Sequence, residues 1–304
     1  MGNNIPSYKM ELINKKENIF GDDITFVEQY DFSTANMSEE NRIKAITTVA
    51  SICYQNPKAI GSESLYNRLL AESKGLPSSS FEFVPVLLTA KKLRKIGSII
   101  NKEIYVKHDF EYNVTKFGEM IEDGKYLLTN LRALIADVGE YAKEFYNTPE
   151  ECEIIKQHFK VFLFKVDLPT RSQMVRHRIS WQELSRRYVS GSRVPFEFYV
   201  SEKMKDVKQT LWIPIDNNTE TSQEVSTDDL INVCIKHYEQ ALKQGVKPQD
   251  ARRIIPQAAY TQIWGAFQPK QLENYFKLRL DESAQWEIRQ TAIAMQELIN
   301  KEEE

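Results

Sequence analysis

The sequence predicts an α+β fold, and three observations lead to it. Most apolar residues recur at helical spacing, the strand-like segments are few, and those segments do not follow one another directly along the chain. The 304 residues, 41% hydrophobic and 27% charged, can bury a sizeable core and have the composition of a globular protein. This length fits two average domains or one large domain with an insertion.

The N-terminal part of the chain predicts two helices and two strands. After a polar start, a short strand is expected around Ile24–Phe26. Apolar spacing predicts helices over Glu39–Tyr54 and Ser62–Ser73. The aromatic and branched residues of Phe81–Leu88 predict a strand, and Pro85 places it near a sheet edge because proline cannot donate a ladder hydrogen bond.

The middle of the chain predicts an amphipathic helix and then a strand. Within the stretch 90–157, apolar residues recur at helical spacing over Tyr126–Tyr146. Such a helix needs a partner that covers its apolar face. The segment Phe159–Val166 reads FKVFLFKV, with apolar residues at alternate positions, and this pattern predicts a strand.

The last third of the chain predicts helices with recognisable ends. Ser226 or Thr227 can cap a helix that Gly245 terminates. Pro248 then opens another helix at its first turn, where a missing N–H costs no hydrogen bond. A final helix is expected from about Asp281 to the charged end of the sequence.

Charge, cysteines and hydropathy exclude several classes of protein. A formal net charge of −3 disfavours a protein that coats nucleic acid. Three cysteines lie far apart with no CxxC pair, and the histidines lack metal-ligand spacing, so we expect neither a disulfide framework nor a metal site. No apolar run approaches the ~18 residues of a membrane span, and no secretory signal is visible. We expect a cytoplasmic protein with no membrane or nucleic-acid partner.

An arginine-rich window carries the first functional signal. Between residues 171 and 193 there is one acidic residue, Glu183, and no lysine. The arginines are Arg171, Arg176, Arg178, Arg186, Arg187 and Arg193. Because a guanidinium group binds phosphate or carboxylate through two parallel hydrogen bonds, this composition favours a defined anion site. The alternative is a solvated charged face, which the interleaved apolar residues disfavour.

A second cluster follows between residues 252 and 289. Arg279 lies among aromatic and aliphatic residues, so it either pairs with Asp281 or Glu287 or faces an anionic ligand. His177 lies between two arginines, which would keep it neutral. No Walker loop, GxGxxG motif or nucleophile–base arrangement is visible, which disfavours the commonest nucleotide folds and a hydrolase.

Five segments together resemble one family. RHRISWQELSRRY (176–188), ARRIIPQAAYT (251–261) and LRLDESAQWEIRQ (278–290) resemble motifs of the flavin-dependent thymidylate synthases, and ASICY (50–54) and SSSFEF (78–83) resemble two weaker upstream blocks. The resemblance implies one domain over residues 1–304, an antiparallel sheet flanked by helices, and a homotetramer with shared active sites. It also implies that dUMP becomes dTMP, with methylenetetrahydrofolate as carbon donor and FAD, reduced by NADPH, as hydride carrier.

The resemblance carries site residues onto this sequence. The positions implied for dUMP are Gln173, Met174, Val175, Arg176, Glu183, Leu184, Ser185, Arg186, Arg187, Arg252 and Arg279. Those implied for FAD are Ser79, Glu82, Arg176, His177, Arg178, Ile179, Glu183, Gln268, Lys270 and Asn274. Arg279 is the implied catalytic residue, held against the pyrimidine ring, where it would stabilise charge that develops on the base.

The sequence departs from the family pattern in four places. Six residues, Ile179–Leu184, stand where seven are usual, so we expect a shortened loop before Glu183. The upstream block has Leu76, Pro77 and Phe83 in place of histidines, and Gln268 and Lys270 stand where Asn and Arg are usual. About seventy residues, 90–157, are inserted, and we expect a helical excursion on the tetramer surface or over the mouth of the site.

Two other functions stay open on the sequence alone. A related flavin enzyme could transfer a different one-carbon unit, such as a hydroxymethyl group, to a pyrimidine nucleotide. A non-catalytic nucleic-acid-binding protein could use the arginine-rich window, although the net charge and the absence of lysine there disfavour it.

Overall fold

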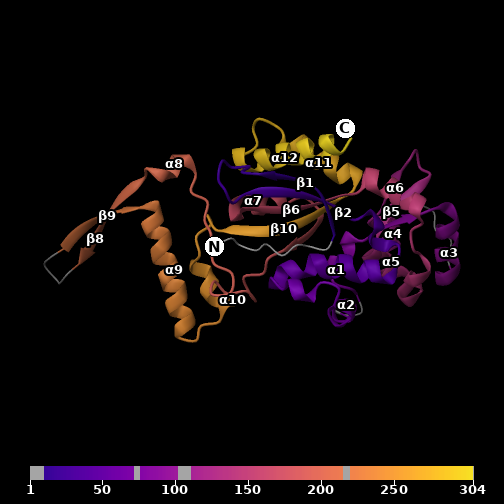
Figure 1. Ribbon diagram of the computed structural model, residues 1–304, viewed down its shortest axis with the longest axis horizontal. Coiled ribbons are helices and arrows are strands. Elements are labelled where there is room, and N and C mark those ends of the chain that lie inside the picture. The colour runs from indigo at the N-terminus through magenta and orange to yellow at the C-terminus, as the bar shows by residue number, and fades with distance from the viewer. Residues whose placement is uncertain (1–9, 72–75, 102–110, 215–219, 304) are drawn as a thin grey trace.

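The computed structural model describes residues 10–71, 76–101, 111–214 and 220–303. Its centre is a five-stranded sheet in the order β1-β2-β6-β10-β7, with every neighbouring pair antiparallel (Figure 1). The strands are β1 Glu11–Glu17, β2 Phe26–Asp31, β6 Lys160–Asp167, β7 Ser180–Glu183 and β10 Tyr260–Phe267. The α+β class and the antiparallel sheet are confirmed.

Helices cover both faces of this sheet, with α1 below it and α11 and α12 above it in Figure 1. The covering helices are α1 Glu39–Tyr54, α7 Leu168–Met174, α11 Pro269–Arg279 and α12 Trp286–Glu303. Strand β6 shows why helices are needed on both faces of the sheet. Val161 and Leu163 join the cluster that contains α1, whereas Phe162 and Phe164 join the one that contains α12, as side-chain alternation requires.

The segment 90–157 adds helices and two strands beside the central sheet. Its elements are α3 Ala90–Ile100, α4 Asn113–Lys116, β4 Glu119–Ile121, β5 Tyr126–Asn130, α5 Leu131–Val138, η4 Gly139–Glu144 and α6 Pro149–His158. β5 lies between β4 and β3, Pro85–Leu88, in a three-stranded antiparallel sheet. The insertion is therefore mixed rather than purely helical.

The predicted helix over Tyr126–Tyr146 is wrong at both ends. Its first five residues form β5, because Leu127 and Leu128 pair with β3 and β4 in the sheet. The Asn130 side chain then caps α5 by accepting from the Ala133 N–H. Gly139, with φ +58°, ends this helix after eight residues, and a 3-10 helix follows.

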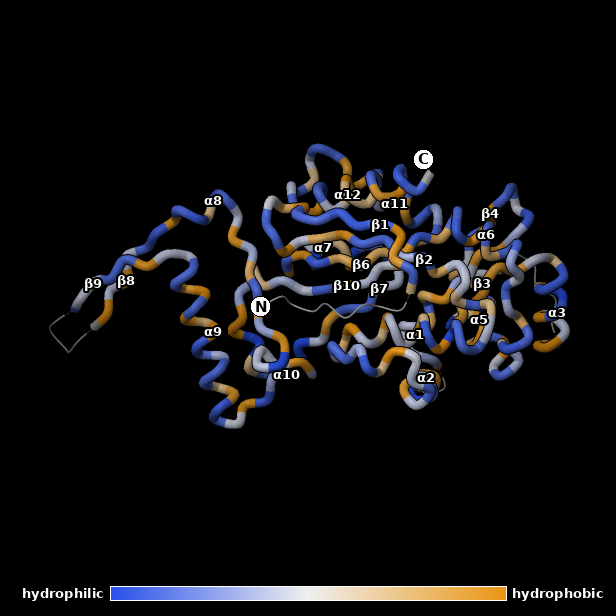
Figure 2. The backbone as a smooth tube through the Cα atoms, in the orientation of Figure 1, coloured by the Kyte–Doolittle hydropathy of each residue, from blue (hydrophilic) through white to orange (hydrophobic). Residues whose placement is uncertain are grey.

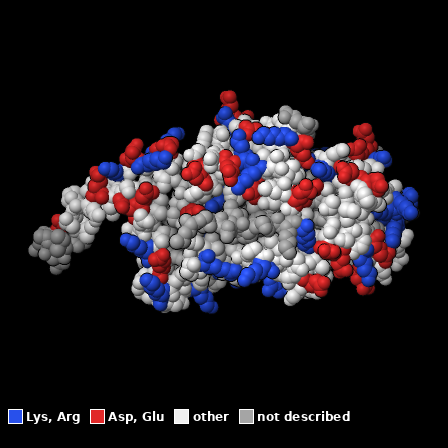
Figure 3. Space-filling model, viewed as in Figure 1, with Lys and Arg blue, Asp and Glu red and all other residues white. Residues whose placement is uncertain are grey.

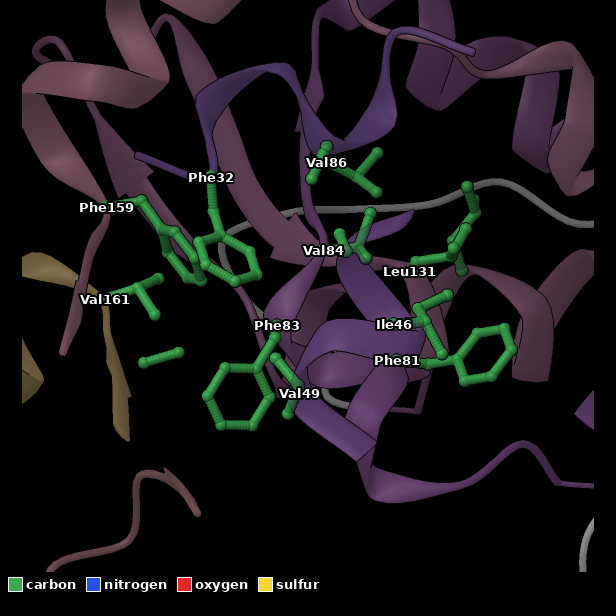
Figure 4. Close-up of a cluster of buried hydrophobic side chains, with 14 of the residues drawn as sticks. Phe32, Ile46, Val49, Phe81, Phe83, Val84, Val86, Leu131, Phe159 and Val161 are labelled. Atoms are coloured by element: carbon green, nitrogen blue, oxygen red, sulfur yellow. The ribbon is translucent and has the colours of Figure 1, made fainter. Parts of the chain in front are cut away.

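The insertion shares a core with the rest of the chain (Figure 4). Leu131 lies in one buried cluster with Ile46 of α1 and Val84, which precedes β3. Leu134 and Phe145 belong to the same cluster and are fully buried. The segment is therefore packed into the molecule and is not only laid over its surface.

The predicted N-terminal elements agree with the structure in part. Helix α1 has the predicted bounds, and α2, Glu63–Leu70, lies within the predicted range, of which residues 72 and 73 are outside the described residues. The strand expected around Ile24–Phe26 begins instead at Phe26. Strand β1 was not predicted, because most of its residues are polar and its apolar residues do not alternate with them (Figure 2). Two 3-10 helices, η1 Ser33–Asn36 and η2 Pro57–Ala59, flank α1.

The segment predicted as one strand over Phe81–Leu88 divides into two elements. Ser79–Phe83 form the 3-10 helix η3, and only β3 is a strand. β3 lies at the edge of its sheet, as Pro85 predicted. The residues before Glu183 form strand β7, Ser180–Glu183, which pairs with β10, and the loop that precedes this strand covers residues 175–179.

The C-terminal helices mostly follow their predicted signals. Helix α9, Thr227–Lys243, begins with a capping box between Ser226 and Asp229, and Gly245 follows it with φ +85°. The helix opened by Pro248 is short: α10, Pro248–Ala251, passes into the 3-10 helix η5, Arg252–Ile254. The final helix begins at Trp286 rather than near Asp281, because the Asp281 carboxylate accepts from Ser283 and forms a local turn.

A hairpin projects from the body of the molecule (Figures 1 and 2). It consists of β8, Lys208–Pro214, and β9, Glu220–Ser226, and the short helix α8, Glu202–Lys205, leads into it. Within the described part of the chain, no helix is long and apolar enough to cross a membrane.

Candidate functional site

A cavity of about 510 Å³ lies where α7, β7 and β10 meet the segment that follows α10. It is lined by Leu168, Arg171, Glu183, Leu184, Ser185, Arg186, Phe196, Arg252, Arg253, Ile255, Gln257, Ala259, Tyr260 and Thr261. Four of these residues are arginines and one is a carboxylate, so the cavity suits an anionic ligand that also offers a hydrogen-bond donor. Its volume lies within the usual range for a small-molecule site.

Glu183 is held by two neighbours inside this cavity. Arg171 on α7 donates from Nε to the Glu183 Oε2 atom over 2.8 Å, and its Nη2 donates to the same oxygen. The Thr261 hydroxyl donates to Oε1 over 3.1 Å. The antiparallel register sets Glu183 opposite Ile263, two residues from Thr261, so both side chains lie on one face of the sheet.

Arg186 lines the cavity, but its guanidinium group donates hydrogen bonds to backbone carbonyl groups. Nη1 donates to the Val194 carbonyl over 2.6 Å, and Nη2 donates to the Pro195 carbonyl over 3.3 Å. The guanidinium also lies over the Phe196 ring, 4.1 Å from its centroid. Burial lowers the pKa of Arg186 to about 10. Arg186 therefore fixes the 194–196 segment as one wall of the cavity.

The arginines after α10 are free to meet a ligand. Arg252 and Arg253 are exposed at the cavity, and within the described residues neither guanidinium has a recorded hydrogen bond. Arg187 differs, because it is exposed outside the cavity lining and its Nε donates to Gln249 Oε1 over 3.3 Å. Among the predicted nucleotide contacts, Glu183, Leu184, Ser185, Arg186 and Arg252 are brought together here.

A second group forms around Arg279 at the end of α11. Its Nε donates to His177 Nε2 over 2.8 Å, and its Nη2 donates to the Gln173 carbonyl over 3.1 Å. Within the described residues, the predicted pairing with Asp281 or Glu287 is not found. The Asp281 carboxylate accepts from Ser283, and Glu287 accepts from Gln285.

His177 is buried, with 7% of its surface exposed, and is held neutral. Burial and then the positive charge of Arg279 lower the pKa of His177 to about 4. Neutrality was predicted from the flanking Arg176 and Arg178, but both of these are exposed. The arginine that acts on the imidazole instead comes from α11. Because Nε2 accepts from Arg279, the ring proton lies on Nδ1.

The two groups lie on different sides of α7. Arg171 lines the cavity, whereas Gln173, two residues later and hence about 200° around the helix, bonds to Gln285 Oε1 over 2.6 Å. Neither Gln173 nor Arg279 lines the cavity. Among the remaining predicted nucleotide contacts, Met174 is fully buried, and Val175 and Arg176 lie in an exposed turn.

Two positions predicted for FAD lie next to β7. The Ser79 hydroxyl donates to Gln182 Oε1 over 2.8 Å. Glu82, three residues later, accepts from Arg132 Nη1 over 2.6 Å, and Arg132 Nε donates to the Pro77 carbonyl over 2.8 Å. Arg132 belongs to the insertion, which therefore borders this part of the site.

Three further predicted FAD positions, Gln268, Lys270 and Arg178, lie at the N-terminus of α11, whereas Glu183 lines the cavity and His177 lies beside Arg279. Gln268 Nε2 donates to the Phe117 carbonyl over 2.9 Å, and the Lys270 N–H donates to the Glu119 carboxylate at 3.0 Å and 3.2 Å. Gln271 Nε2 reaches the Arg178 carbonyl over 3.0 Å. Ile179 is half-buried and Asn274 is exposed.

The side chains at these positions are of the hydroxyl, amide and cationic types that can bind a pyrophosphate and a ribityl chain. In the structure, the Ser79 hydroxyl, the Gln268 amide and the Lys270 N–H each donate to a protein group. Glu119 shows that this end of α11 accepts an anion, since its carboxylate already lies on a backbone N–H there. Burial raises the pKa of Glu119.

Several cavity residues were not predicted as site residues. Those with polar side chains are Arg171, Arg253, Gln257, Tyr260 and Thr261. Arg171 belongs to the arginine-rich window and the others lie within 251–261, so their motifs were visible although their roles were not. Tyr260 is fixed from outside the motif, because its hydroxyl donates to Asp22 Oδ2 over 2.6 Å.

The fold and the cavity define an α+β protein that gathers arginines from two distant segments around one cavity. A family model described as thymidylate synthase complementing protein matches residues 149–303, and the chain belongs to this family. Three relatives carry the name flavin-dependent thymidylate synthase, so the resemblance seen in the sequence is confirmed.

These three relatives align over about half of this chain. The Pyrococcus abyssi protein is 35% identical over 156 residues, which are 50% of this chain and 59% of that protein. The Thermotoga neapolitana protein is 33% identical over 144 residues, 46% of this chain and 62% of that protein. The Thermosipho melanesiensis protein is 30% identical over 165 residues, 52% of this chain and 70% of that protein. The chain thus matches about three fifths of the length of the first two relatives.

Proposed function

We propose that this protein is a flavin-dependent thymidylate synthase that methylates dUMP to dTMP. Methylenetetrahydrofolate would be the carbon donor and NADPH the reductant, and bound FAD would supply the hydride. The observation that carries the proposal is the arginine-lined cavity, in which Glu183, Ser185 and Arg186 of the signature motif meet Arg252. The relatives named as such enzymes add support.

Different residues would bind different parts of dUMP. Arg252 and Arg253, whose guanidinium groups are exposed, would bind the phosphate, because two forked cations match its charge and geometry. The Glu183 carboxylate would accept from a donor of the nucleotide. Arg279 would lie against the pyrimidine and stabilise negative charge that develops on the ring.

The separation of the two groups supports the prediction of a homotetramer with shared active sites. Arg252 lines the cavity, whereas Arg279 lies on the other side of α7, outside the lining. A site that uses both would combine the cavity of one chain with Arg279 of another. Light scattering should then give four times the 35.4 kDa chain mass.

The shared site can be tested by mixing two inactive variants. Arg252→Ala and Arg279→Ala each remove one side of every site, so each variant alone should make almost no dTMP. After subunit exchange, some sites would join an intact cavity to an intact Arg279, and activity should return. Activity that stays absent after verified exchange would show that each chain holds a complete site.

The insertion would lie over the flavin side of the site. Its residues Phe117, Glu119 and Arg132 contact three positions predicted for FAD, namely Gln268, Lys270 and Glu82. These contacts support the prediction that the segment covers the mouth of the site.

The product of the reaction decides the function. The purified protein should show a flavin absorbance spectrum that changes on addition of dUMP, and mass spectrometry should detect dTMP after addition of methylenetetrahydrofolate and NADPH. A hydroxymethyl product would instead identify a related one-carbon transferase. DNA or RNA binding without any flavin would contradict the proposal. Figure 3 shows acidic and basic side chains interspersed on the face it presents, which favours the enzyme.

A further inference from the structure

We propose that Arg171 is a positioning residue that acts on dUMP through Glu183. This inference rests on the proposed function, in which Glu183 accepts a hydrogen bond from the nucleotide. Arg171 is outside the set of positions that the family resemblance implies.

The contacts of Glu183 leave one oxygen available. Both recorded donors of Arg171, Nε and Nη2, reach Oε2. Thr261 takes a single position on Oε1. A carboxylate oxygen can accept about two hydrogen bonds, so among the described residues Oε2 is saturated and Oε1 keeps one position for a ligand in the cavity. The hydrogen bonds from Arg171 and Thr261 thus determine which oxygen of Glu183 faces the nucleotide.

Arg171 is poorly placed to bind the phosphate directly. Its recorded donors are committed to Glu183, and the side chains of both residues are largely shielded, with 33% and 22% of their surfaces exposed. Arg252 and Arg253 are more exposed and have no recorded side-chain hydrogen bonds within the described residues. We therefore assign the phosphate to the residues after α10 and the orientation of Glu183 to Arg171.

The loss of Arg171 should free the carboxylate. Glu183 would keep the hydrogen bond from Thr261 alone and could rotate about its side-chain bonds, so its acceptor would no longer be fixed before dUMP arrives. The loss of Arg171 should therefore lower the affinity for dUMP. This decrease should disappear in a variant in which residue 183 cannot accept the same hydrogen bonds.

A double-mutant cycle on dUMP affinity tests this coupling. We would measure the Kd for dUMP by calorimetry for the full-length wild type, Arg171→Gln, Glu183→Gln and the double variant. We expect Arg171→Gln to raise the Kd roughly tenfold in the wild-type background and less than about twofold in the Glu183→Gln background. Arg171→Lys, which keeps one cationic donor, should fall between wild type and Arg171→Gln.

The control is Arg94→Gln, an exposed arginine on α3 outside the cavity lining, and it should leave the Kd unchanged. Equal effects of Arg171→Gln in both backgrounds would overturn the inference while leaving the proposed function intact. A wild type that binds no dUMP would overturn the proposed function and this inference with it. If Arg171→Gln does not fold, Arg171→Lys carries the same comparison.

Discussion

Arg279 donates a hydrogen bond from Nε to the Nε2 atom of His177 over 2.8 Å. This bond joins α11 to the Arg-His-Arg motif, 102 residues earlier in the chain. It requires a neutral imidazole, and the guanidinium is itself one reason why the imidazole stays neutral. The Arg-His-Arg motif and the motif at residues 278–290 are therefore in contact, and the protonation state of His177 in the first depends on Arg279 in the second.

The stability of the protein should depend on the protonation of His177. Its pKa is lowered from 6.5 to about 4, so between these values the unfolded chain binds a proton that the folded chain does not. The stabilisation is complete above pH 6.5 and is lost as the pH falls to about 4. Over this window the loss should be on the order of 3 kcal/mol.

Urea unfolding of wild type and His177→Gln between pH 7 and pH 4 measures this contribution. Carboxylates also titrate in this range, so the informative quantity is the difference between the two proteins. The free energy of unfolding should fall more steeply for the wild type. Parallel curves would contradict the lowered pKa.

Arg279→Ala should nearly abolish dTMP formation. We expect turnover to fall by about 10²–10³-fold, because the proposed role of this guanidinium is to stabilise charge on the pyrimidine ring. Chromatographic assay of dTMP measures this, and circular dichroism and flavin absorbance check that the fold and the cofactor remain. Lys277→Ala, at an exposed position of the same helix, is the matched control. Near-normal turnover of Arg279→Ala would exclude the assigned role.

Arg187 lies outside the cavity lining of its own chain, so in a shared site it would contact the nucleotide bound by another chain, and Arg187→Ala should mainly weaken dUMP binding. Because this side chain is exposed and bonds only weakly to Gln249, the fold should be unaffected. The KM for dUMP should rise about tenfold with little change in kcat if the guanidinium binds the ground state and the transition state alike. Steady-state kinetics beside Arg193→Ala, another exposed arginine, measure this change. A lower kcat at unchanged KM would argue against the prediction.

The insertion should be necessary for folding. Leu134 is fully buried in the cluster that also contains Leu163 and Trp264 of the central sheet. Leu134→Ala should therefore destabilise the protein by about 2–5 kcal/mol, measured by urea unfolding. Tyr141→Ala, at a half-exposed position of η4, is the control and should cost far less.

Replacement of residues 92–156 by a short linker extends the same prediction. The deletion removes part of the shared core, so we expect no soluble folded protein. A soluble deletion variant with a cooperative unfolding transition would show that the central sheet folds without the insertion.

The local elements of the fold could be predicted where a side chain acts on its own backbone. Helix α1 has the predicted bounds, and α9 begins at the predicted Ser226 cap, because capping hydrogen bonds span three residues. Strand β6 followed from its apolar alternation. The predicted helix over Tyr126–Tyr146 failed because pairing with β3 and β4 outweighed the helical spacing of its first residues.

The sequence by itself determined the family, the order of the motifs and the arginine-rich character of the site. Only the tertiary structure decided which arginines share a cavity, that Arg171 is committed to Glu183, and that His177 owes its neutrality to burial and then to Arg279. The physical reason is that hydrogen bonds between distant residues depend on strand register and on the side of a helix. A motif determines which side chains are present, and the packing of the sheet determines which of these side chains come into contact.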